Sequence, residues 1–312
     1  MSQTDQSLAG GVCDLESGVC ALPGDSAALP GATAGHPVPE VGLTRITYVT
    51  DPICSACWIL EPAWRSLTER YRDLIDVRHV YGGLLRGWQG FHDAGNGIRR
   101  PEDVAHHWDE FAQISGQPIN SSVWWSDPID SSYPPSIALA AVRRLAPEHE
   151  EAYLRRLREE LFLDGRNIAA PGLLEALVAE LGLDVASYRR LIENGEAEAE
   201  FERDLVRTHE LGARGFPTLI LEGPDGRVVL HGWIQPDRLE NTFLTVSGAA
   251  RRPVVSSIGE AADRLGTGTS LEYAALTGHS VTEVEELLTR AGATSRPVGK
   301  GRAWSPKQRN RR

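Results

Sequence analysis

Long apolar runs are missing from this 312-residue sequence. No stretch approaches the roughly 18 apolar residues that a membrane-spanning helix needs, which argues against an integral membrane protein. The N-terminus also lacks the basic start and the apolar core of a secretory signal peptide. We therefore expect a soluble, cytoplasmic protein, and 41% hydrophobic residues are enough for one large domain with smaller appendages.

Cysteine is scarce, with four residues in the chain: Cys13, Cys20, Cys54 and Cys57. The gap between the first two exceeds the usual spacing of zinc ligands, and the nine histidines form no C-x2-C…H-x3-H or H-E-x-x-H pattern. We therefore expect no metal and no cofactor, although a zinc knuckle and an inert buried pair stay as alternatives for Cys54 and Cys57. In a reducing compartment a disulfide is more often catalytic or transient than structural.

An excess of positive charge is absent as well, because the net charge is −11. Residues 1–40 carry −5 and residues 251–312 carry +5, with eleven basic against six acidic side chains, so the body, 41–250, carries −11. An acidic body argues against nucleic-acid binding there. The seven basic residues of 296–312 could still contact nucleic acid or an acidic protein, but a solvated tail is the simpler interpretation.

Cys54 and Cys57 lie where an expected strand passes into an expected helix. Residues 45–50 are β-branched or aromatic with alternation, which is typical of a strand. After Pro52, residues recur at three- and four-residue steps and indicate the buried face of a helix: Cys57, Leu60, Trp64, Leu67 and Tyr71. We therefore expect Cys54 to be exposed at the helix start and Cys57 to lie one turn inside.

This placement suits dithiol–disulfide chemistry. The thiolate is the reactive form of cysteine, and an ordinary thiol, with a pKa of about 8.5, is mostly protonated at neutral pH. A helix N-terminus carries about half a positive charge and favours an anion at Cys54. Two intervening residues let the Cys57 thiol reach Cys54, either to close a disulfide or to resolve a mixed one.

A proline enters a second expected strand far downstream, at 215–221. Proline cannot donate a ladder hydrogen bond, so the first residue of a strand, where Pro217 lies, is a typical position for it. This stretch alone leaves open whether the preceding peptide bond is trans or cis.

Together these motifs resemble the DsbA-type thiol:disulfide oxidoreductase family over residues 43–248. The resemblance rests on Cys54 and Cys57 followed by Trp58, on Pro62 in the helix, and on the 215–218 turn. Segment 164–168 is similar to the FrnE-like branch of the family. Segments 50–54 and 82–85 are similar to SpxH, a bacterial adaptor that delivers a regulator to the ClpXP protease.

The resemblance implies a thioredoxin-like α/β fold with an inserted helical domain. It also implies that Cys54 is the attacking nucleophile, that Cys57 is the resolving thiol, and that a cis-proline loop orients a client. That loop comprises Phe216, Pro217 and Thr218. The two residues between the cysteines, Ser55 and Ala56, depart from the family, where Pro or His is common, so the direction of the reaction stays open.

Two classes of function follow from the resemblance. An oxidoreductase would have client proteins with thiols or disulfides as partners. An SpxH-like adaptor would hold a protease or a regulator on the same scaffold and use the cysteines to sense redox state. A kappa-type glutathione transferase or isomerase is a third option, but such proteins generally replace the cysteine pair, which Cys57 contradicts.

The rest of the chain divides by composition. Residues 1–40 are rich in Gly, Ala, Ser and Pro, which predicts a disordered tail. Its thiols, Cys13 and Cys20, could form a local disulfide, bind a metal weakly, exchange with Cys54, or have no role. Residues 41–250 would form the α/β domain, with a helical insertion at about 101–195. Three tryptophans of the insertion are expected to pack in the core, with a substrate groove as the alternative: Trp108, Trp124 and Trp125.

The C-terminal part reads as a small helical module at 251–295, resembling a helix-turn-helix, followed by a basic disordered tail at 296–312. Ser280 and Glu283 form a capping box at the start of its last helix. That helix carries Glu283, Glu285 and Glu286, which would repel phosphate. We therefore expect a packing or protein-docking module.

Overall fold

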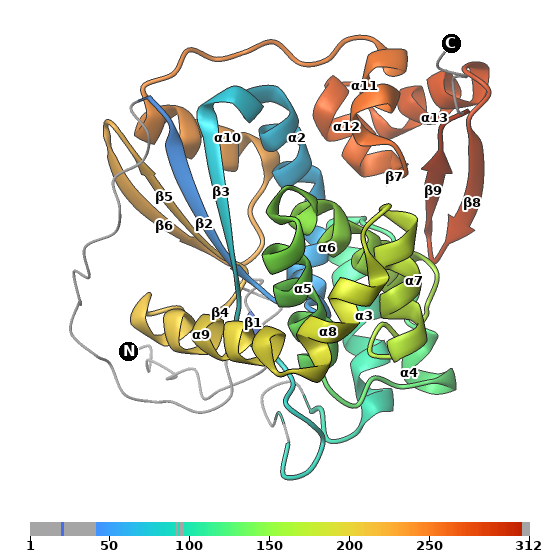
Figure 1. The fold of residues 1–312 in the computed structure, drawn as a ribbon. Coiled ribbons are helices and arrows are strands. Elements are labelled where there is room, and N and C mark those ends of the chain that lie inside the picture. Colours follow the sequence, from blue (N-terminus) through green and yellow to red (C-terminus); the bar gives the residue numbers. More distant parts are fainter. Residues whose placement is uncertain (1–19, 22–41, 92, 94–96, 308–312) are drawn as a thin grey trace, which may run out of the picture.

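A four-stranded mixed sheet forms the centre of the computed structural model, which describes residues 20–21, 42–91, 93 and 97–307 (Figure 1). Its strand order is β3-β2-β5-β6. β2 is parallel to β3 and antiparallel to β5, which is antiparallel to β6. The strands are β2 (Thr44–Thr50), β3 (Ile75–Tyr81), β5 (Thr218–Gly223) and β6 (Gly226–His231). The strands expected at 45–50 and 215–221 are confirmed as β2 and, from Thr218 onward, β5.

Helices that flank the sheet complete the core of the fold. α10 packs against β5, β6 and α2, and α9 packs against β3. Their bounds, with the short helices beside them, are α1 (Ser55–Ile59), α2 (Glu61–Tyr71), η1 (Arg72–Leu74), α9 (Glu196–Glu210) and α10 (Pro236–Ser247). Pro62 and Pro236 lie in the first turns of α2 and α10, where the missing N–H costs nothing. Strand, helix, strand, inserted helices, helix, hairpin and helix follow one another in thioredoxin order.

The helical insertion lies beside the sheet, coloured green to yellow in Figure 1. It comprises α3 (Pro101–Ser115), α4 (Val123–Ser126), α5 (Tyr133–Leu145), η2 (Pro147–His149), α6 (Glu150–Arg158), η3 (Glu159–Leu163), α7 (Pro171–Glu180) and α8 (Val185–Glu193). Residues 147–163 pass through consecutive 3-10, α and π segments. Trp108 and Trp124 are buried edge to face, whereas Trp125 is 57% exposed, so core packing holds for two of the three.

A separate C-terminal module has its own small core. It comprises α11 (Ile258–Leu265), β7 (Gly268–Thr269), α12 (Ser270–Thr277), α13 (Val281–Arg290), β8 (Thr294–Val298) and β9 (Gly301–Ser305). The capping box of Ser280 and Glu283 is confirmed at the start of α13. The expectation of a disordered tail from 296 onward is wrong as far as 305, because β8 and β9 form a hairpin. Trp304 anchors it in the core of the module.

Most of the predicted N-terminal tail lies outside the described residues. The exception is β1 (Cys20–Ala21), which pairs antiparallel with β4 (Gly215–Phe216). Within the described residues, none of the helices is both long and apolar enough to cross a membrane.

Candidate active site

The turn between β2 and α1 sets the position of the two cysteines. Asp51 is buried and organises this turn: its carboxylate accepts hydrogen bonds from the N–H groups of Ile53 (3.0 Å) and Leu84 (2.7 Å) and from the Ser132 hydroxyl (2.9 Å). Burial raises the pKa of Asp51 to about 6. Cys54 then lies three residues beyond Asp51, at the start of α1.

Cys54 is the N-cap of α1, and its Sγ accepts the N–H of Cys57 at 3.2 Å. The strand-to-helix placement of the pair is therefore as expected. The expected exposure of Cys54 is wrong: both cysteines have 0% of their surface exposed, and no disulfide joins them to each other. Sequence periodicity places Cys54 at a helix end, but it cannot show what covers that end.

A buried cation lies among the groups around the dithiol. Arg158, at the end of α6, is 1% exposed. Its guanidinium donates to the Thr50 hydroxyl and to the Glu61 carboxylate, each at 2.6 Å. It also lies over the ring of Tyr48, 5.8 Å from the ring centroid. A buried charge held by such contacts acts on nearby thiols with little screening by water.

The two thiols respond differently to these surroundings. Burial opposes the ionisation of Cys57, but the hydrogen bond from the Cys54 thiol, the charge of Arg158 and the Thr50 hydroxyl together lower the pKa of Cys57. Burial raises the pKa of Cys54, and the adjacent Cys57 raises it further. We therefore place the first negative charge of the reduced pair on Cys57, with the proton of Cys54 directed toward it. The helix N-terminus, taken alone, predicts instead that the negative charge lies on Cys54.

The downstream proline motif meets the dithiol at one end of the sheet. Val49 in β2 pairs with Thr218 in β5, so the residues just before Thr218 lie beside the end of β2 and the turn that follows it. The Phe216–Pro217 peptide bond is cis. The Thr218 hydroxyl contacts the Gly215 carbonyl at 2.7 Å and His231 Nδ1 at 3.1 Å. The structure thus brings Phe216, Pro217 and Thr218 to the cysteine end of the fold.

Gly82 makes room for this loop. A Cβ built on Gly82 would lie 2.2 Å from Cζ of the fully buried Phe216 ring. We expect Gly82→Ala to displace Phe216 and to lower the free energy of unfolding by about 1–3 kcal/mol, measured by urea titration. Gly87→Ala is the matched control, because its added Cβ would meet only the Asp130 carbonyl oxygen at 3.8 Å. Equal stability of the two variants would contradict this role of Gly82.

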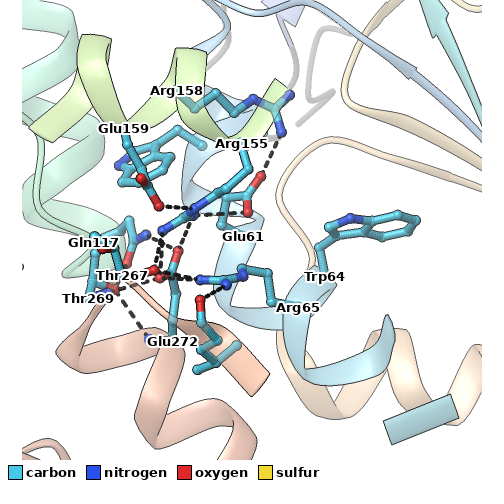
Figure 2. A network of polar contacts seen from close by, with 12 residues as sticks. Glu61, Trp64, Arg65, Gln117, Arg155, Arg158, Glu159, Thr267, Thr269 and Glu272 are labelled. Carbon is cyan, nitrogen blue, oxygen red and sulfur yellow. Dashed lines mark hydrogen bonds and ion pairs between the residues drawn. The ribbon is translucent and has the colours of Figure 1, made fainter. Parts of the chain in front are cut away.

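An ion-pair network runs from the dithiol region to the C-terminal module (Figure 2). Glu61 accepts from Arg158 and, through its other oxygen, from Arg155 at 3.1 Å. Arg155 in turn forms a two-pronged pair with Glu272 of α12, at 2.6 and 3.0 Å, and Arg65 of α2 reaches the same carboxylate at 3.1 Å. The network borders a cavity of about 940 Å³ that neither cysteine lines. The ion-pair network therefore links α2, α6 and the C-terminal module.

Sequence reasoning missed two residues of this site, Arg158 and Asp51. Arg158 falls in a run with Arg155 and Arg156, which reads as a solvated helix face. Helical periodicity could have predicted its burial, because Arg158 lies four residues after buried Leu154, on the apolar side of α6. Asp51 directly follows a β-strand, where an acidic residue is commonly a turn residue; only the fold brings Ser132 and the Leu84 N–H to it.

Comparisons with known proteins agree with this architecture. A family model described as thioredoxin matches residues 48–225. The chain is 32% identical over 170 residues to the ClpXP adapter protein SpxH of Halalkalibacterium halodurans, covering 54% of this chain and 56% of that protein. It is 26% identical over 187 residues to SpxH of Bacillus subtilis, covering 59% of each. The chain thus spans little more than half the length of the curated relatives it matches.

Solved structures give the same fold. The cytosolic disulfide reductase DsbM from Pseudomonas aeruginosa is 27% identical, with a TM-score of 0.50 over 64% of this chain and 97% of that one. A candidate protein disulfide isomerase from Nitrosomonas europaea is 21% identical, with a TM-score of 0.54 over 65% of this chain and 98% of that one. The chain therefore belongs to the thioredoxin family, in its DsbA-like form with an inserted helical domain.

Proposed function

We propose that this protein is a dithiol–disulfide oxidoreductase that acts on protein thiols through a mixed disulfide at Cys54. The observation that carries the proposal is the buried pair itself: two thiols at a helix N-terminus, with Arg158 and the Thr50 hydroxyl lowering the pKa of one of them. An inert cysteine pair needs no such stabilisation of a thiolate.

In this proposal the reaction runs in two exchanges. The proton of Cys54 passes to Cys57, and the Cys54 thiolate attacks one sulfur of a client disulfide, whose other sulfur leaves as a thiolate. Cys57 gives this proton to the released client thiolate and, as a thiolate again, attacks the Cys54 sulfur, so that the second client sulfur leaves and the client is reduced. The client gains two electrons and the pair becomes the Cys54–Cys57 disulfide. The same steps in reverse would oxidise a client, and both steps together would isomerise one.

Similarity to DsbM supports the reductive direction and a cytoplasmic location. DsbM is described as a cytosolic disulfide reductase, and a second DsbM structure contains GSH. Glutathione is therefore a suitable electron donor for assay. The test is reduction of insulin and reactivation of scrambled ribonuclease by wild type and by Cys54→Ser. If the two proteins were indistinguishable, the oxidoreductase assignment would fail.

A trapping variant would identify the clients. In Cys57→Ala, the resolving thiol is absent, so mixed disulfides at Cys54 should persist long enough for affinity capture and release by reductant. Cys54→Ser in the same background is the control, since it should release no protein on reduction.

A second candidate function is that of an adaptor. It is favoured by the similarity to SpxH proteins, which are ClpXP adapters by name, and by the acidic surface of α13, which carries Glu283, Glu285 and Glu286. A protease or a regulator would then be the partner. Proteins that stay bound to the double variant Cys54→Ser/Cys57→Ser, and that reductant does not release, would support this function over turnover.

A further inference from the structure

A buried carboxylate of the C-terminal module contacts both the α/β domain and its helical insertion. Glu272 lies in α12, which packs against α2 (Figure 1). Its side chain is fully buried and accepts from Arg155 at 2.6 and 3.0 Å and from Arg65 at 3.1 Å. The Thr269 N–H and the Gln117 side-chain amide donate to the same carboxylate, at 2.9 and 3.3 Å. Glu272 therefore occupies this position only while the module is docked.

The ion pairs that start at Glu272 form a row in which the sign of the charge alternates (Figure 2). Glu272 pairs with Arg155, which also contacts Glu61 at 3.1 Å. Glu61 in turn pairs with Arg158 at 2.6 Å. These four side chains are at most 12% exposed. Water therefore screens their charges weakly, and a change in one pair alters how the next pair shares its charge.

The far end of this row lies at the cysteine pair. Arg158 donates to the Thr50 hydroxyl at 2.6 Å, and its charge favours the thiolate of Cys57. Glu61 and the Cys57 thiolate are thus two anions that draw on the same cation. A tighter pair of Glu61 with Arg158 leaves less of the Arg158 charge for the thiolate, and a looser pair leaves more.

Other titratable groups around Arg158 hold a constant charge near neutral pH. Burial raises the pKa of Tyr48 and lowers the pKa of His79 to about 4, so both side chains are neutral. Burial also raises the pKa of Asp51 to about 6, so it is mostly a carboxylate at neutral pH. A change in the row of ion pairs therefore acts on Cys57 against a fixed background of charge.

We propose that Glu272 is a positioning residue through which the docked C-terminal module weakens the hold of Arg158 on the Cys57 thiolate. This inference rests on the oxidoreductase function proposed above and adds regulation to it. Glu272 engages Arg155 with two hydrogen bonds, so less of the Arg155 charge is available to Glu61. Glu61 then stays on Arg158. When the module moves away, Arg155 binds Glu61 more tightly, and Arg158 is left to the thiolate.

The consequence for electron transfer has a definite direction. A dithiol whose thiolate is better stabilised is more stable in its reduced form, and it therefore oxidises clients more readily. The docked module would make the cysteine pair a better reductant, and undocking would make it a better oxidant. α12 lies outside residues 48–225, which match the family model. The regulation would therefore be an addition to the shared fold.

The ultraviolet absorbance of the thiolate against pH, measured on the full-length chain, tests this inference. Cys13→Ser and Cys20→Ser together leave the cysteine pair as the source of the thiolate signal. In this background Glu272→Gln should lower the pKa of Cys57 by about half a pH unit, a fraction of the effect of a directly adjacent charge. The equilibrium with glutathione should shift toward the reduced pair by up to about threefold. Glu260→Gln is the matched control and should change neither value, because Glu260 pairs with a surface arginine of the same module.

A double-variant comparison separates the row of ion pairs from a direct effect of charge. If Glu272 acts through Glu61, Glu272→Gln should leave the pKa of Cys57 unchanged in a Glu61→Gln background. A shift of the same size in that background would overturn the positioning role. Arg155→Met should raise the pKa of Cys57, because Glu61 then pairs with Arg158 alone. General loosening of the structure would instead move Arg155→Met and Glu272→Gln in the same direction and would contradict the inference.

The outcomes also separate this inference from the proposed function. Urea titration identifies the variants that are folded. If folded Glu272→Gln keeps the thiol pKa of the wild type and still reduces insulin, the regulation is wrong and the oxidoreductase stands. If the pKa shifts as expected but the wild type reduces no insulin, the electrostatic link stands and the oxidoreductase fails. If Glu272→Gln does not fold, Arg155→Met carries the test, and an unchanged or lowered pKa of Cys57 in that variant would overturn the inference.

Discussion

Replacing Arg158 with methionine should raise the pKa of Cys57 by about one to two pH units, the usual effect of removing one adjacent opposite charge. Arg158 is buried, and its charge is one of the groups that lower this pKa. Methionine fills a similar volume without charge or strong hydrogen bonds. At a pH below the pKa of the variant, less of Cys57 is then the thiolate that accepts the proton of Cys54, and thiol–disulfide exchange should slow.

The measurement is the ultraviolet absorbance of the thiolate against pH, supported by the pH profile of insulin reduction. Arg156→Met is the matched control, since it removes the same charge from the same helix but from a residue that pairs with Glu159, Glu160 and Glu180. Arg158→Lys should restore part of the effect, because it keeps the charge but loses the two-pronged geometry. Urea titration would first show that Arg158→Met is folded. An unchanged thiol pKa in the folded variant would then show that Arg158 does not lower the pKa of Cys57.

Local patterns predicted most of the fold. The strand at 45–50 and the helix that follows it depend on residues close in sequence. Alternation, helical periodicity and turn residues therefore identified them. The inserted helices were found for the same reason. Pro171 starts one of them, and Gly195, with φ of 77°, follows the end of another, in keeping with the conformational preferences of proline and glycine.

Features that depend on distant contacts were not predictable in this way. Cys54 is at the expected helix end, but its burial comes from the tertiary arrangement. The hairpin of β8 and β9 was missed because its basic residues are typical of a solvated tail, while its order comes from Trp304, packed against α11–α13. Arg158 shows the same limit: an arginine is predicted to be exposed unless its buried partners, Thr50 and Glu61, are known.

The ion-pair network gives the C-terminal module a physical link to the cysteine pair. Glu272 belongs to the module, Arg155 and Arg158 to the insertion, and Glu61 to the helix that follows the cysteines. Within the network, the Glu61 and Glu272 carboxylates each contact two guanidinium groups. Removing one charge therefore leaves two largely buried cations with less compensation, which is costly in a low-dielectric interior.

Glu272→Gln should accordingly lower the free energy of unfolding by about 3 kcal/mol at neutral pH, within the range for breaking a buried ion pair. Glu272 is fully buried, and its partners Arg155 and Arg65 would keep their charges. Urea titration of the full-length protein is the measurement. Glu260→Gln is the control, because Glu260 is half exposed and pairs with Arg264 at the surface, where such a pair contributes at most about 1 kcal/mol.

The lowered pKa of Glu272 also predicts how the free energy of unfolding changes with pH. Burial opposes the ionisation of Glu272, but Arg155 and Arg65 hold its pKa below the usual value. A carboxylate whose pKa is lower in the folded state stabilises the protein above its unfolded pKa, about 4.3, and this stabilisation is lost as the pH falls through the folded value. The stability difference between wild type and Glu272→Gln should therefore be full at neutral pH and shrink in acid. A difference that stays constant down to the acid transition would mean that the loss comes from packing rather than charge.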